Sequence, residues 1–106
     1  MSKKLGKISS ARVGFDSDGR FGFWLKFTGE DMGAEWSMHY WPLKPSNTSS
    51  IHKQIEEKRK VIIETIECNL KLAKKTFVSE LLGSPVEIEF DEMGKLMSWR
   101  ILTEVL

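Results

Sequence analysis

The sequence predicts a single α+β domain in which an antiparallel sheet packs one face against one long helix. Near both ends of the chain, apolar and polar residues alternate in short segments, as they do in strands with one buried face. Over residues 51–82, apolar residues instead recur every three or four positions, as in an amphipathic helix. The 106 residues are enough for one hydrophobic core and too few for two.

The expected order of elements is β-β-β-α-β-β across one domain, residues 1–106. A three-stranded meander covers residues 7–41, and a polar loop covers residues 42–50. The long helix follows over residues 51–82, and a closing hairpin ends the fold over residues 85–103. Aspartate–glycine and proline-containing segments separate these elements, as expected of turns.

The clearest strand alternates Phe21, Phe23, Leu25 and Phe27 with smaller or polar residues and Trp24. We expect the phenylalanine face to cover the helix, which places Trp24 on the opposite face of the sheet. In the next strand, Trp41 faces away from Trp36 in the same manner. Met97, Trp99 and Ile101 are expected to share the core face of the last strand. In the first strand, Ala11, Val13 and Phe15 share one face.

The long helix has a predicted start at Ser49 or Ser50 and a predicted end at Gly83, where a C-terminal glycine belongs. A helix of this length is roughly 48 Å long, whereas strands of seven to nine residues span about 23–30 Å. One end would therefore overhang the sheet and expose apolar side chains. A break near residues 67–69 would remove the problem, but we favour a homo-oligomer, since symmetric dimers are common.

Composition narrows the class of protein. Hydrophobic residues make up 41% and charged residues 29% of the chain, as in an ordinary globular domain. The net charge of +1 argues against binding to nucleic acid or to an anionic membrane. We find neither a signal peptide nor a membrane-spanning apolar run, and Cys68 is the one cysteine, so the expected location is the cytoplasm.

The sequence contains no recognisable catalytic constellation. His39 and His52 have no second histidine or cysteine at the spacing of a metal site. Cys68 lies in the predicted helix, where we expect a buried and inert thiol. Nothing resembles a nucleophile with its base and orienting group. We therefore expect a protein that is not an enzyme and that uses no cofactor or metal.

Five residues are candidates for ligand binding: Arg100, Arg20, Arg12, Trp24 and Trp41. Arg100 stands in an apolar strand, where it could clamp a phosphate or form an ion pair with Glu87, Glu89 or Glu35. Arg12 and Arg20 flank the first hairpin and either join a basic pocket or remain solvated. The two tryptophans form either a stacking platform for a flat ligand or a surface covered by another subunit, a terminus or a loop.

Two segments carry a resemblance to known proteins. Residues Gly6-Lys7-Ile8-Ser9-Ser10-Ala11, with the glycine-punctuated aromatic strands that follow, resemble the start of small accessory proteins of tailed phages. Residues Ser98-Trp99-Arg100-Ile101-Leu102-Thr103-Glu104-Val105 resemble their C-terminus. More distantly, the order of elements, the expected oligomer and the late arginine are similar to phage anti-Thoeris sponge proteins, which sequester nucleotide-like immune signals between subunits without cleaving them.

This resemblance implies a phage-encoded anti-defence protein in the cytoplasm of the host cell. It implies a homo-oligomer with a nucleotide-like small molecule as its ligand, and it places Arg100 and Arg20 as phosphate-contacting residues. The alternative is an inhibitor that binds a host defence or replication protein through the face of Trp24 and Trp41. A single-stranded nucleic-acid binder ranks lower because of the near-zero net charge.

Overall fold

The computed structural model describes residues 2–41 and 49–105, without the side chains of residues 49–52 and 105. The expected order of elements and the α+β class are confirmed: a five-stranded antiparallel sheet has the order β3-β2-β1-β4-β5, with one α-helix inserted before β4. The elements are β1 (Ser2–Phe15), β2 (Phe21–Gly29), β3 (Met32–Tyr40), α1 (Ser49–Ala73), a 3-10 helix (Val78–Leu81), β4 (Pro85–Phe90), β5 (Leu96–Ile101) and a second 3-10 turn (Thr103–Val105).

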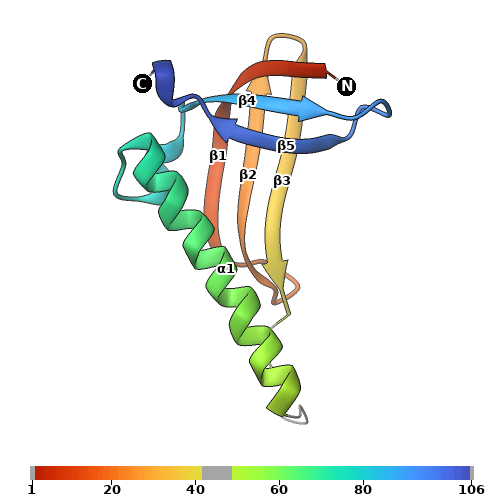
Figure 1. Ribbon diagram of the computed structural model, residues 1–106, viewed down its shortest axis with the longest axis vertical. Coiled ribbons are helices and arrows are strands. Elements are labelled where there is room, and N and C mark those ends of the chain that lie inside the picture. Colours follow the sequence, from red (N-terminus) through yellow and green to blue (C-terminus); the bar gives the residue numbers. More distant parts are fainter. Residues whose placement is uncertain (1, 42–48, 106) are drawn as a thin grey trace.

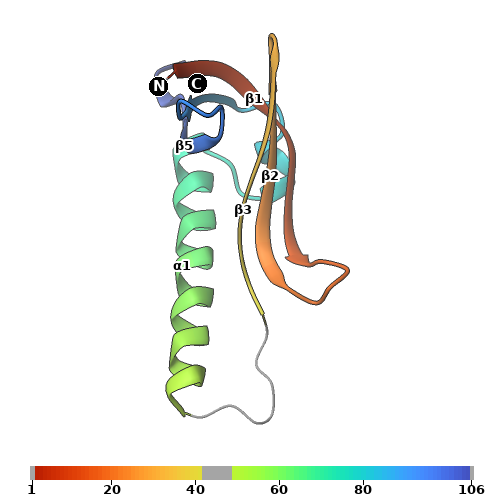
Figure 2. The ribbon, with the colours of Figure 1, turned by 90° about the vertical axis from the view of Figure 1, so that its right-hand side faces the viewer.

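Strand β1 starts earlier than the sequence predicts and joins two halves of the sheet. Its first residues pair with β4, from Ser2 opposite Phe90 to Lys7 opposite Pro85, and its later residues pair with β2. The sheet therefore folds over itself, and the β4–β5 hairpin crosses β2 and β3 on the side of α1 (Figures 1 and 2).

Glycines permit this crossing. A Cβ atom on Gly6 would lie 2.7 Å from the carbonyl oxygen of Thr28, and one on Gly29 would lie 2.6 Å from that of Leu5. Because the two backbones approach so closely, no side chain fits between them.

The core lies between strands β1–β3 and the layer formed by α1 and the β4–β5 hairpin (Figure 2). We call this side of β1–β3 the inner face and the opposite side the outer face. Phe23, Leu25 and Phe27 are buried on the inner face, as predicted. Trp99 of β5 packs against Phe27 and Trp36, with ring centroids 5.4 and 5.1 Å apart.

Helix α1 ends at Ala73, so the prediction of a helix to residue 82 is wrong. Lys74 has a φ of 59°, its N–H donates to Lys71 (3.2 Å), and the N–H of Lys75 donates to Leu70 (2.9 Å). These bonds form the Schellman cap, which usually contains a glycine at the position that lysine occupies here. The chain then enters the 3-10 helix, and Phe77, predicted to lie on the apolar stripe, is 67% exposed.

Several smaller expectations also need correction. The helix is continuous through residues 67–69, where a break was considered, and Cys68 is exposed rather than buried. Met97 is exposed because the pairing register shifts between Glu89 and Phe90, which brings Leu96 toward the core in its place. Of the predicted loop, residues 42–48 lie outside the described part of the chain, and residues 49–50 already belong to α1. Within the described part, no helix is long and apolar enough to cross a membrane.

Candidate binding face on the outer side of the sheet

The β1–β2 turn prepares one side of the candidate site. The Oδ1 atom of Asp16 accepts hydrogen bonds from the backbone N–H groups of Asp18 (3.0 Å) and Arg20 (2.8 Å). Gly19 completes the turn with a φ of 89°, a conformation that glycine adopts without strain. The same carboxylate receives the Arg20 side chain, whose Nε donates to Oδ2 at 2.8 Å.

The charge of Asp16 is secured by these contacts. Burial alone would raise the pKa of its carboxyl group, but the hydrogen bonds from the Arg20 backbone and side chain outweigh it, and the pKa is lowered. The carboxylate therefore holds the Arg20 guanidinium over the outer face. There the guanidinium carbon lies 5.7 Å from the ring centroid of Trp41.

A second arginine stacks on a second tryptophan on the same face. Arg12 of β1 and Trp24 of β2 are directly paired across the strands, and the guanidinium carbon of Arg12 lies 4.4 Å from the Trp24 ring centroid. The ring of His39, from β3, is parallel to that of Trp24 within 4°, with centroids 6.2 Å apart. One side chain from each of three strands thus forms a row, Arg12–Trp24–His39.

Gly22 makes room for this row. It stands opposite His39 in the β2–β3 pairing, and a Cβ atom there would lie 2.4 Å from the carbonyl oxygen of Met38 and 2.6 Å from Cβ of His39. Any larger residue would push His39 away from Trp24.

Arg20 connects the two arginine–tryptophan pairs through His39. Its Nη1 lies 3.3 Å from Nε2 of His39, and Nδ1 of His39 lies 3.2 Å from Oγ of Ser37. A guanidinium can only donate, so in a hydrogen bond between these two atoms Nε2 of His39 is the acceptor. Sequence reasoning treated His39 as an isolated histidine. Its position two residues before Trp41, on the same face of the predicted strand, was the signal that could have included it.

The charges of this face are unequally matched. Lys26 pairs with Glu35 at 3.7 Å, and Arg20 is held by Asp16. Among the described residues, no carboxylate pairs with Arg12, whose guanidinium donates to the backbone oxygen of Phe15 at 3.1 Å. Arg12 is therefore one cation of this face that is available to an external anion.

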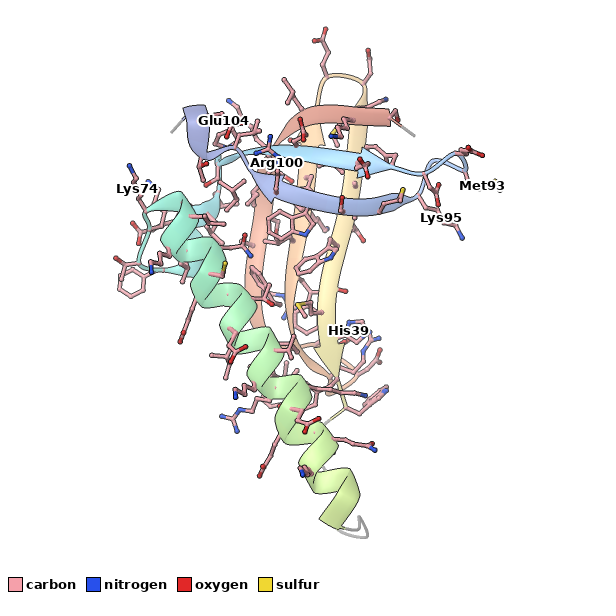
Figure 3. The ribbon with its side chains drawn as sticks, viewed as in Figure 1. His39, Lys74, Met93, Lys95, Arg100 and Glu104 are labelled. Carbon is pink, nitrogen blue, oxygen red and sulfur yellow. The ribbon has the colours of Figure 1, made fainter. Side chains whose placement is uncertain are left out.

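Arg100 lies apart from the other four candidates. It belongs to β5 and forms ion pairs with Glu87 and Glu104, each at 3.2 Å. The hydrogen bonds that Arg100 donates to Glu104 and then to Glu87 raise the pKa of the guanidinium, and the first of these bonds lowers the pKa of Glu104. Figure 3 shows Arg100 beside Glu104. His39 lies well away from both, near the C-terminal end of β3 (Figure 3). Of the ion pairs expected for Arg100, with Glu87, Glu89 or Glu35, the structure shows the one with Glu87.

A groove adjoins the outer face at the free edge of β3. Its volume is about 630 Å³, and its apolar part is formed by Met38 of β3 with Val61 and Ile62 of α1. Polar groups complete its lining: Ser37, His39, Gln54, Glu57 and Lys58.

The chemical groups that the outer face presents are aromatic rings and guanidinium hydrogen-bond donors. The described residues contain no group of three or more side chains arranged to hold a metal ion. Arg12, Arg20, Trp24 and Trp41 come together as one surface, which suits reversible binding of a flat, anionic group. No protein-family model, curated protein or solved structure matches this chain.

Proposed function

We propose that this chain is a non-enzymatic binding protein whose outer face takes up a small, flat, anionic ligand of the nucleotide class. The observation that carries the proposal is the stack of Arg12 on Trp24, in which the guanidinium has no carboxylate partner among the described residues. The N–H groups of a stacked guanidinium point outward in its plane, where they can form paired hydrogen bonds with a phosphate. The exposed Trp41 ring offers a surface on which a base can stack.

In its sharpest form, the proposal is that a phage-encoded anti-defence protein sequesters a nucleotide-derived immune signal in the host cytoplasm. The resemblance of residues 6–11 and 98–105 to tailed-phage accessory proteins, and the more distant similarity to sponge proteins, support this form. The net charge of +1 favours a small ligand over a nucleic-acid polymer. We further propose that the protein acts as a homo-oligomer, as those proteins do.

A thermal-shift screen against cyclic oligonucleotides and cyclic ADP-ribose isomers tests the proposal. A ligand at about 100 times its dissociation constant adds roughly 2.7 kcal/mol to the free energy of unfolding. We expect one ligand to raise the melting temperature, Arg12→Ala to abolish the shift, and the ligand to be recovered intact after denaturation. Arg100→Ala is the matched control, since its guanidinium is already paired with Glu87 and Glu104, and it should retain the shift. A chain that shifts with none of these compounds is not a sponge for them.

A second candidate function is inhibition of a host protein through the same face. Trp41 is 57% exposed, and tryptophan and arginine are the residues most enriched at the centres of protein interfaces. An inhibitor would show no nucleotide shift. It would bind one defence or replication protein with an affinity that Trp41→Ala lowers at least tenfold.

A further inference from the structure

The two edges of the sheet differ in how they are protected from pairing. Edge strand β5 has six residues, contains Arg100 and is interrupted by a register shift. Edge strand β3 has nine residues, pairs with β2 without a shift, and contains neither proline nor lysine. Long, regular edges without such protection are the ones that accept another strand.

The free backbone groups of β3 belong to alternate residues. Gly29 and Met32 close a two-residue hairpin loop and are therefore a hydrogen-bonded pair, so every second residue from Met32 onward bonds to β2. The N–H and C=O groups that point away from β2 are those of Gly33, Glu35, Ser37 and His39. Among the described residues, no other backbone hydrogen bond reaches them.

We propose that β3 pairs antiparallel with β3 of a second copy of this chain, about a two-fold axis at Ser37. This inference deepens the oligomer of the proposed function by naming its interface. An antiparallel pairing of one strand with itself is isologous and closes as a dimer.

Three complementary pairs single out this register. It places Glu35 opposite His39 of the other copy, which sets an acid against an imidazole. It places Ala34 opposite Tyr40 on the inner face, a small residue against a large one. It also places the exposed Trp41 opposite Gly33, where a Cβ atom would meet nothing closer than 4.0 Å. A cross-strand aromatic over a bare glycine is a known way to stabilise a strand pair.

Neighbouring registers lose these pairs. A shift of the axis to Trp36 sets Glu35 against Ser37 and stacks Trp36 on itself. A shift by a further residue sets Glu35 against Glu35, and like charges directly opposite are unfavourable.

The pairing would also join the two outer faces. Each Arg12–Trp24–His39 row ends at β3, so the two rows would meet across the axis on one continuous surface. On the other side of the sheet, the β4–β5 hairpin crosses β3 and extends beyond its edge (Figures 1 and 3).

Disulfide trapping in a Cys68→Ser background tests both the interface and the register. Ser37→Cys should form a dimer on mild oxidation, because the axis passes through this position and paired Cα atoms lie within disulfide reach. Glu35→Cys and His39→Cys should each remain uncrosslinked, because each residue lies four positions, or roughly 13 Å, from its own copy. An equal mixture of the two variants should crosslink.

Sedimentation velocity of the unmodified chain supplies the second measurement. We expect a dimer, and we expect Ser37→Pro to give a folded monomer, since it removes an N–H that points away from β2. A monomer at all concentrations, a dimer that survives Ser37→Pro, or a Glu35→Cys variant that crosslinks with itself would each overturn the pairing. A monomer that still shows the nucleotide shift would overturn the pairing while leaving the proposed binding function intact.

Discussion

The guanidinium carbon of Arg12 lies 4.4 Å from the ring centroid of Trp24, its direct cross-strand partner on the outer face. Exposed cation–π contacts stabilise a fold by about 0.5–1 kcal/mol. We therefore expect a double-mutant cycle with Arg12→Ala and Trp24→Ala to give a coupling energy of about 0.5–1 kcal/mol. Urea denaturation measures it, and additive effects of the two substitutions would show that the stack does not persist in solution.

A methyl group at Gly22 should be far more damaging than one at Gly33 on the same face. The Cβ at Gly22 would meet the Met38 carbonyl at 2.4 Å, whereas the Cβ at Gly33 has 4.0 Å of clearance. We expect Gly22→Ala to lower the free energy of unfolding by about 2 kcal/mol or more, and Gly33→Ala to change it by less than about 0.5 kcal/mol. Denaturation of dilute protein compares them. Equal effects would mean that His39 does not lie over Gly22.

Lys74→Gly should stabilise the protein. Lys74 has a φ of 59° at the end of α1, which costs a residue with a side chain about 1–2 kcal/mol. Glycine removes this strain but gains entropy in the unfolded chain, so we expect a net increase of about 0.5–1 kcal/mol in the free energy of unfolding. Lys75→Gly is the control and should not stabilise. A loss of stability in Lys74→Gly would argue that the helix continues beyond Ala73.

Stability should fall in acid, in part through Asp16 and Glu104. Contacts with Arg20 and Arg100 lower the pKa of these carboxyl groups in the folded state. Their contribution is therefore fully present above the unfolded pKa values, about 4, and is lost as the pH falls through the lower folded values. Denaturation at a series of pH values should show a decline below about pH 4. The decline should be shallower in Asp16→Asn, and an unchanged slope would contradict the role given to Asp16.

Truncation of two phenylalanines should cost very different amounts of stability. Phe27 is 1% exposed and packs against Trp99, so Phe27→Ala should cost about 3–5 kcal/mol. Phe77 is 67% exposed after the end of α1, and Phe77→Ala should cost less than about 0.5 kcal/mol. A large loss of stability in Phe77→Ala would indicate that the helix extends past Ala73, as the apolar periodicity predicts.

The sequence predicted those features that local pattern determines. Strict alternation placed Phe23, Leu25 and Phe27 on the buried face and Trp24 on the other. Asp16 and Asp91 each begin a turn that ends at a glycine with positive φ, and both turns were predicted from this chemistry.

The sequence failed where tertiary contacts override local pattern. Residues 78–82 keep helical spacing, but the cap at Lys74 ends the helix earlier without the expected glycine. Nothing in residues 2–6 indicates a strand, because their partner, β4, lies at the other end of the chain. The candidate site was predicted only in part, again because local pattern determines only some of it. Alternation places Trp24 and Trp41 on the outer face, but the residues that contact His39 and Arg100 depend on the order of the strands.

The division of β1 between two partners has a consequence for how the chain folds. Ser2 pairs with Phe90, so the start of β1 cannot pair until a partner 88 positions later in the sequence has been made. Contacts between such distant segments are slow to form because a large loop must close first. During synthesis, the meander of β1, β2 and β3 would leave the ribosome with Phe27 and Trp36 still lacking the cover of Trp99. Strand β5, which is made after the meander, therefore completes this part of the core, and a chain cut before β5 would expose these aromatic residues to aggregation.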